Sequence, residues 1–216
     1  MATGTDRLRR GRAQRSRLGG LVGGGTAGNE QLTALTGIVL ILLLAALGVT
    51  IVRIGGLLDA HMFIGMLLIG PVILKLSSTG YRFLRYYTSS PQYRAKGPPA
   101  IELRMLAPLV VATTIVVFSS GVALLFVGPS GRGDLTAIHK VSFFAWLAVT
   151  ALHVLGHLTQ LPRSLAGNRH GARDWDDRGS GRGARALALS GALVGGLVLA
   201  LLVESQFPAW AHFHHH

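Results

Sequence analysis

The sequence lacks cysteine and is poor in charged residues. With no Cys among the 216 residues, disulfide bonds, thiolate-held iron–sulfur clusters and covalent c-type haem attachment are excluded. Charged residues account for only 14% of the chain, whereas hydrophobic residues account for 50%. This balance is typical of a polytopic membrane protein without a sizeable soluble domain.

Acidic residues are especially scarce within the apolar segments. Asp59 stands at the edge of one segment and Glu204 at the end of another, so a carboxylate relay through the membrane has no candidate residues. The sequence also shows no nucleophile–base pair, phosphate-binding loop or catalytic carboxylate set. Hydrolysis and group transfer are therefore without candidate residues.

Five apolar segments are long enough to cross the hydrocarbon core of a bilayer. They cover residues 32–54, 58–76, 105–127, 135–161 and 186–203. We predict an all-α polytopic membrane bundle, in which residues 31–161 form four helices. Residues 186–216 are predicted to form a fifth helix and an external His-rich tail. The Gly191-xxx-Gly195 step in the fifth segment favours close helix packing, so we expect this helix to pack through that glycine face.

The net charge of +12 is concentrated between the apolar segments. Six Lys or Arg precede the first segment, five separate the second from the third, and six separate the fourth from the fifth, against Arg53, Arg132 and Lys140 on the opposite side. This asymmetry predicts a plasma-membrane protein with a cytoplasmic N-terminus and an external C-terminus. Residues 1–30 are expected to be a disordered basic cytoplasmic segment, and residues 162–185 a cytoplasmic basic loop. Such clustering is typical of a topology signal, and no nucleic-acid partner is expected.

The fourth segment carries three histidines on one predicted helix face. Spacings of four and three align His139, Phe143, Trp146, Thr150, His153 and His157 along one seam. His139 lies near one membrane surface. His153, fourteen positions later, lies about 21 Å farther along the helix axis. Histidines in a membrane span are costly and usually face the bundle interior, so the seam is a candidate cofactor, metal or proton site.

His61 lies near the start of the second segment, and His139 lies near the start of the fourth. Both segments run in the same direction, so the two histidines are predicted to lie at nearly the same depth. Two imidazoles level with each other on facing helices are what a bis-histidine haem iron requires. Gly65, one turn beyond His61, would leave room for the macrocycle. Arg53 and Lys140 lie near the same surface, where they would pair with haem propionates.

The histidine pattern resembles that of the membrane-embedded b-type cytochromes, in which parallel helices carry histidines separated by thirteen residues. His139 and His153 have this spacing, but fourteen positions after His61 the chain has Lys75, where a dihaem cytochrome has histidine. The resemblance covers residues 32–161. It implies an electron-transfer subunit of a membrane oxidoreductase, with one haem b per chain and a redox protein or quinone as partner. The stretch LSSTGYRFLRYY and the His-Lys pair of the fourth segment are also similar to uncharacterised multi-pass membrane proteins of actinobacteria.

Other interpretations remain open from the sequence. His61 alone is typical of an interfacial residue that is hydrogen-bonded to water or headgroups. His153 and His157, one turn apart, would either bind a metal as a pair or join a hydrogen-bonded cluster with Thr150 and Lys75. No second haem is expected beside them. The rival function is a cofactor-free membrane protein (a transporter, assembly factor or scaffold) with structural histidines, and a homo-oligomer is compatible with either function.

Overall fold

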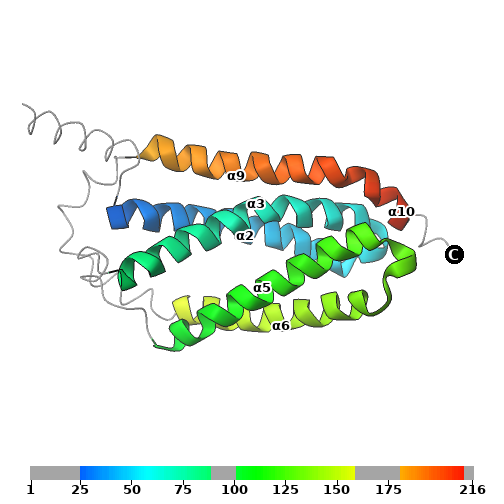
Figure 1. The fold of residues 1–216 in the computed structure, drawn as a ribbon, viewed down its shortest axis with the longest axis horizontal. Helices are drawn as coiled ribbons and strands as arrows, with labels where there is room; N and C mark the ends of the chain where they lie inside the picture. The colour runs from blue at the N-terminus through cyan, green and yellow to red at the C-terminus, as the bar shows by residue number, and fades with distance from the viewer. Residues whose placement is uncertain (1–24, 89–100, 159–180, 212–216) are drawn as a thin grey trace, which may run out of the picture.

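The computed structural model describes residues 25–88, 101–158 and 181–211, and the secondary structure within these ranges is helical throughout (Figure 1). The all-α fold class is therefore confirmed. The predictions for residues 1–24, for residues 162–180 and for the His-rich end of the tail lie outside the described residues. Residues 25–30, predicted to be disordered, and residues 182–185, predicted to be a loop, are instead the first turns of helices, so these parts of the two predictions are wrong.

Five long helices account for most of the described chain. They are α2 (Gly25–Val52), α3 (Ile54–Tyr87), α5 (Ile101–Val127), α6 (Gly133–Leu158) and α9 (Arg182–Val203). Short helical turns follow α5 and α9: η1 (Pro129–Gly131), η3 (Glu204–Gln206) and α10 (Phe207–Ala211). Each long helix contributes a stretch long and apolar enough to cross a membrane, with a mean hydropathy between 1.5 and 2.8. The predicted multi-pass architecture with five spans is confirmed.

Successive helices run in opposite directions. Helices α2, α5 and α9 begin at the end of the bundle where α3 and α6 finish (Figure 1). The second and fourth spans are therefore parallel, as predicted from the sequence. This arrangement sets the first three turns of α3 and α6, which carry His61 and His139, at the same end of the bundle.

A very short turn joins α2 to α3. Arg53 leaves the helical conformation with φ −122° and ψ 40°, and its carbonyl accepts hydrogen bonds from the backbone N–H groups of Gly56 and Leu57, both at 3.0 Å. Leu57 is again non-helical, with φ −128° and ψ 25°. The chain thus reverses between Arg53 and Leu57.

Helix α3 is the central helix of the bundle. It packs against α2, α9 and α5, while α6 packs mainly against α5. The fifth span is thus a direct neighbour of the second. A small core of Met66, Leu125, Ala200 and Phe207 joins α3, α5, α9 and α10 near the end where α3 begins. Most other large apolar side chains are exposed, as expected for helices surrounded by lipid.

The α3–α9 contact is a close crossing of two backbones. A Cβ atom added to Gly196 would lie 2.1 Å from the Leu67 carbonyl oxygen, and one added to Gly70 would lie 2.0 Å from the Ala192 carbonyl oxygen. Pro71 lies inside α3 here and has no N–H to donate to the Leu67 carbonyl. Gly196 therefore covers a carbonyl that lacks its usual helical donor.

The predicted packing of the fifth helix through Gly191 and Gly195 is wrong. Neither glycine has an atom within 4 Å of an added Cβ. The contact instead uses Ala192 and Gly196, which form the same four-residue step one position later. A shift of one residue rotates a helix face by about 100°, so a second set of small residues with equal spacing faces α3 instead.

Candidate functional site

His61 of α3 is held by α2. Its Nδ1 lies 3.0 Å from the hydroxyl oxygen of Thr50, and that hydroxyl donates to the Leu47 carbonyl at 2.6 Å. A threonine hydroxyl has a single proton. Because this proton is used in the bond to Leu47, Nδ1 of His61 is the donor in the bond to Thr50. The neutral ring then carries its free lone pair on Nε2.

His139 of α6 is held by α5 in the same way. Its Nδ1 donates to the Val117 carbonyl at 3.1 Å and also lies 3.0 Å from the hydroxyl of Ser120. A carbonyl oxygen only accepts, so Nδ1 carries the proton here as well. The Ser120 hydroxyl donates to the same Val117 carbonyl at 3.1 Å. His139 therefore also has its free lone pair on Nε2.

A glycine of α5 supports the His139 ring. A Cβ added to Gly121 would lie 3.1 Å from Cε1 of His139 and 3.5 Å from its Nδ1. The imidazole thus lies directly on the backbone of α5, one turn after Val117. Gly121, Ser120 and Thr50 are not predicted from the sequence. Their only sequence signal is a small or hydroxylated residue inside an apolar span, and apolar spans contain many of these.

His61 and His139 belong to different helix pairs, and both side chains are half-buried at the same end of the bundle. Each ring is fixed by its Nδ1 to a neighbouring helix. Among the described residues, no hydrogen bond reaches Nε2 of either ring, so the site is a pair of neutral imidazoles with Nε2 available on each.

The remaining predicted site residues lie around this pair. Gly65, one turn beyond His61, is half-buried, and no atom lies within 4 Å of an added Cβ, so there is open space on its side of α3. Arg53 is exposed in the α2–α3 turn, and Lys140 is exposed beside His139. Both cations are thus at the same end of the bundle as the two histidines.

The predicted seam of α6 faces α5. Beyond His139, the indole Nε1 of Trp146 donates to the Thr114 hydroxyl at 3.0 Å, and Phe143 stacks on Trp146 with ring centroids 6.3 Å apart. The Thr114 hydroxyl in turn donates to the Val110 carbonyl at 2.6 Å. The middle of the seam is therefore an interhelical packing contact.

The far end of the seam carries His153 and His157. His153 is half-buried, whereas the side chain of His157 lies outside the described residues. The predicted pairing of these two histidines on a metal is therefore not described by the structure. Among the described side chains, no group of three or more His, Cys, Asp or Glu is arranged to hold a metal ion.

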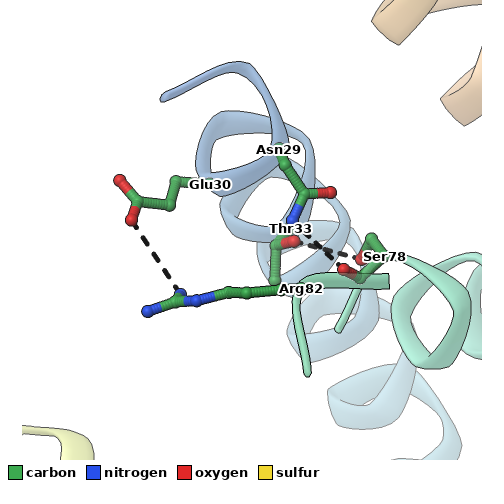
Figure 2. A network of polar contacts seen from close by, with 5 residues as sticks. All are labelled: Asn29, Glu30, Thr33, Ser78 and Arg82. Atoms are coloured by element: carbon green, nitrogen blue, oxygen red, sulfur yellow. Dashed lines mark hydrogen bonds and ion pairs between the residues drawn. The ribbon is translucent and has the colours of Figure 1, made fainter. Parts of the chain in front are cut away.

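Lys75 faces α2 and not the α6 seam. Its Nζ donates to the Thr33 carbonyl at 2.7 Å, and it lies 3.1 Å from the position of a Cβ added to Gly37. The Thr33 hydroxyl donates to Ser78 at 3.0 Å, and the Asn29 amide donates to the Ser78 carbonyl at 3.1 Å (Figure 2). The expected cluster of Lys75 with the α6 histidines is wrong, because the lysine side chain is directed to the backbone of α2.

The imidazole nitrogens of His61 and His139 are of the chemical type that would hold a haem iron. The protein-family models, the curated proteins and the solved structures with which the chain was compared contain no match. Any function assigned to the site therefore rests on the geometry of its own residues.

Proposed function

We propose that the protein is an integral membrane b-type cytochrome, which carries electrons through one haem held by His61 and His139. The observation that carries this proposal is the matched tautomer of the two rings. Each imidazole donates from Nδ1 to a fixed acceptor on a neighbouring helix and has its lone pair on Nε2. Both rings are thus prepared as metal ligands before any metal is bound.

The hydrogen bonds made by Nδ1 of the two rings support this assignment. Histidines that bind metals usually donate their other ring N–H to a carbonyl, carboxylate or water, which fixes the tautomer and makes the ligating nitrogen more basic. The Val117 carbonyl performs this role for His139, and the Thr50 hydroxyl performs it for His61. An occupant that binds both Nε2 atoms would use the lone pairs that the Nδ1 contacts leave available.

The surrounding residues suit a flat, anionic macrocycle. Open space beside Gly65 would accommodate it, and Gly121 lets Cε1 of the His139 ring approach α5 closely. Arg53 and Lys140 are exposed at the same end of the bundle, where they would pair with propionates. When bound, haem b supplies reversible one-electron chemistry. The partner that delivers or accepts the electron is a redox protein or a quinone.

The proposed location is a plasma membrane, with the N-terminus in the cytoplasm and the C-terminus outside. The support is the charge count in the sequence, which gives seventeen Lys and Arg on one side and three on the other. This orientation would set His61 and His139 near the outer surface and Lys75 nearer the cytoplasm. A reporter fused after His216 should be active only if its reaction occurs outside the cytoplasm.

A cofactor-free membrane protein is the second candidate function, and one observation favours it. Both Nδ1 atoms already have protein partners, so the histidines also serve as interhelical hydrogen bonds without any ligand. In that case the pair would stabilise the α2–α3 and α5–α6 hairpins. This function makes no use of the free Nε2 atoms, which is why we prefer the haem assignment.

The absorption spectrum of the purified protein separates the two candidates. Protein produced with sufficient haem should be red, show a low-spin Soret spectrum and contain one haem per chain by pyridine haemochrome titration. His61→Ala and His139→Ala should each abolish or convert the low-spin spectrum, whereas His153→Ala should largely preserve it. Colourless, folded protein would favour the cofactor-free function. Loss of haem only in the His153 variant would exclude the assigned ligands.

A further inference from the structure

Helix α3 continues well beyond the apolar segment that the sequence delimits. The predicted span ends at residue 76, but α3 extends to Tyr87 and is 34 residues long. At 1.5 Å per residue this is roughly 51 Å, against about 30 Å for the hydrocarbon core of a bilayer. The last eleven residues rise about 16 Å, which is enough to cross the whole headgroup layer on that side.

The extension displays aromatic and apolar side chains on several sides of the helix. Tyr81 is 50% exposed, Phe83 65%, Leu84 59% and Tyr87 51%. A helix projecting into water would gain nothing from such exposure. Tyrosine and phenylalanine at this density are typical of the membrane–water interface, where their rings lie among headgroups and upper acyl chains.

Three arginines accompany these rings, and two of them are tied to aromatic partners. The guanidinium of Arg85 lies 6.0 Å from the centre of the Tyr81 ring, and Nη2 of Arg104 donates to the Tyr87 hydroxyl at 2.8 Å. Arg82 has a loose ion pair with Glu30 at 4.0 Å, in which both side chains are over 40% exposed (Figure 2). All three cations remain exposed, and Glu30 offsets at most one of them.

We propose that this surface, formed by Tyr81–Tyr87 of α3 together with Arg104 of α5, binds the headgroups of anionic phospholipids. Guanidinium groups bind phosphate oxygens with two parallel hydrogen bonds, and the aromatic rings hold them at headgroup depth. An acidic soluble protein would match the charge equally well. The lipid is favoured because Phe83 and Leu84 are exposed beside the arginines. The proposal concerns a different end of the bundle from the histidine pair and does not depend on haem.

The thermal stability of the full-length protein in lipid nanodiscs tests this surface. The Tm should be about 5 °C higher in phosphatidylcholine discs containing about a third phosphatidylglycerol than in pure phosphatidylcholine. The double variant Arg82→Gln/Arg85→Gln should lose most of this shift, and Arg85→Lys should retain most of it. The matched control is Arg182→Gln, which removes an exposed arginine of α9 at the same end of the bundle and should keep the full shift.

Several outcomes would overturn the proposal. If Arg182→Gln loses as much of the Tm shift as the double variant, the protein responds to the overall charge of the leaflet. In that case α3 carries no specific lipid site. A Tm increase caused by inorganic phosphate in phosphatidylcholine discs would mean that the surface binds free phosphate. Suppose that Arg85→Gln keeps the lipid-dependent Tm shift but no longer binds an acidic protein that the unmodified chain binds. The surface would then have a protein partner instead. If the double variant fails to fold, native mass spectrometry of the unmodified protein still decides, because preferential retention of phosphatidylglycerol over phosphatidylcholine is required.

Discussion

Polar side chains gather at two ends of the bundle, and they are used differently. At the histidine end, His61 and His139 each attach one nitrogen to a neighbouring helix and keep the other free. At the lysine end, comprising Asn29, Thr33, Lys75 and Ser78, the hydrogen bonds connect α2 and α3 directly to each other. The first arrangement leaves acceptors available for an additional group, whereas the second joins two helices.

The difference shows why an ionisable residue in a membrane span does not by itself indicate a cofactor. Lys75 is as unusual in a span as the histidines, yet its ammonium reaches the Thr33 carbonyl of α2 at 2.7 Å. A flexible side chain with three donors can reach a nearby carbonyl from many positions. An imidazole is rigid, so fixing one nitrogen also fixes the direction of the other. Of the two sets of residues, His61 and His139 are the ones arranged to present ligand atoms.

The largest expected effect comes from disrupting the contact between α3 and α9. Helix α3 contributes residues to both the histidine end and the lysine end of the bundle, namely His61 and Lys75. Gly196→Leu places atoms where the Leu67 carbonyl now lies, 2.1 Å from an added Cβ. Overpacking of this kind typically costs about 1–3 kcal/mol, and we expect a Tm lower by about 5–10 °C. Gly195→Leu is the matched control, since no atom lies within 4 Å of its added Cβ. If both variants lowered the Tm equally, the close crossing of α3 and α9 at Gly196 would be contradicted.

Hydropathy was enough to predict the five spans and their alternating directions, because a bilayer requires long apolar helices. It did not define the rotation of each helix about its axis. Gly191 and Ala192 begin equivalent small-residue steps that differ by about 100° in direction, and only packing against α3 selects the second. The end of α3 was also underestimated, because polar residues after Leu76 stop an apolar segment but not a helix.

The candidate site was only partly accessible from the sequence. His61 and His139 were identifiable because histidines are rare in spans and these two are matched in depth. Their partners were not identifiable, because Thr50 lies on α2 and Ser120 on α5, and hydroxyl residues occur along most spans. Lys75 was assigned to the wrong neighbour, since a depth estimate does not say which adjacent helix a side chain faces.

The next prediction compares two threonines, one at each end. Thr50→Val removes the acceptor for the Nδ1 proton of His61, and we expect haem affinity to fall by about 10–100-fold. Thr33→Val removes one hydrogen bond to Ser78 but keeps the backbone carbonyl that binds Lys75, so it should cost about 1 kcal/mol of stability and leave haem affinity unchanged. Haem titration of the apoprotein measures the first effect, and thermal unfolding measures the second. Equal haem affinities in the two variants would show that the ends do not differ as described.

Gly121 and Gly37 allow a further comparison of the two ends, because an added Cβ would lie equally close to a neighbouring side chain at each. A Cβ added to Gly121 would be 3.1 Å from Cε1 of His139, and one added to Gly37 would be 3.1 Å from Nζ of Lys75. The imidazole is held by two hydrogen-bond partners, whereas a lysine terminus moves aside easily. We therefore expect Gly121→Ala to weaken haem binding about tenfold, in line with altering a ligand's support. Gly37→Ala should leave it unchanged, and a loss of affinity in Gly37→Ala would contradict the separation of the two ends.

The smallest expected effect is that of Ser120→Ala. The Ser120 hydroxyl lies 3.0 Å from Nδ1 of His139, but the same nitrogen also donates to the Val117 carbonyl at 3.1 Å. Removing the hydroxyl leaves this carbonyl as an acceptor, and the carbonyl alone is sufficient to keep the proton on Nδ1. We expect haem affinity to change by less than about threefold, well below the effect of Thr50→Val, because His61 has only the Thr50 hydroxyl as its Nδ1 acceptor among the described contacts. Haem titration of both variants under the same conditions makes the comparison. A Ser120 effect as large as the Thr50 effect would mean that the hydroxyl, and not the carbonyl, fixes the tautomer of His139.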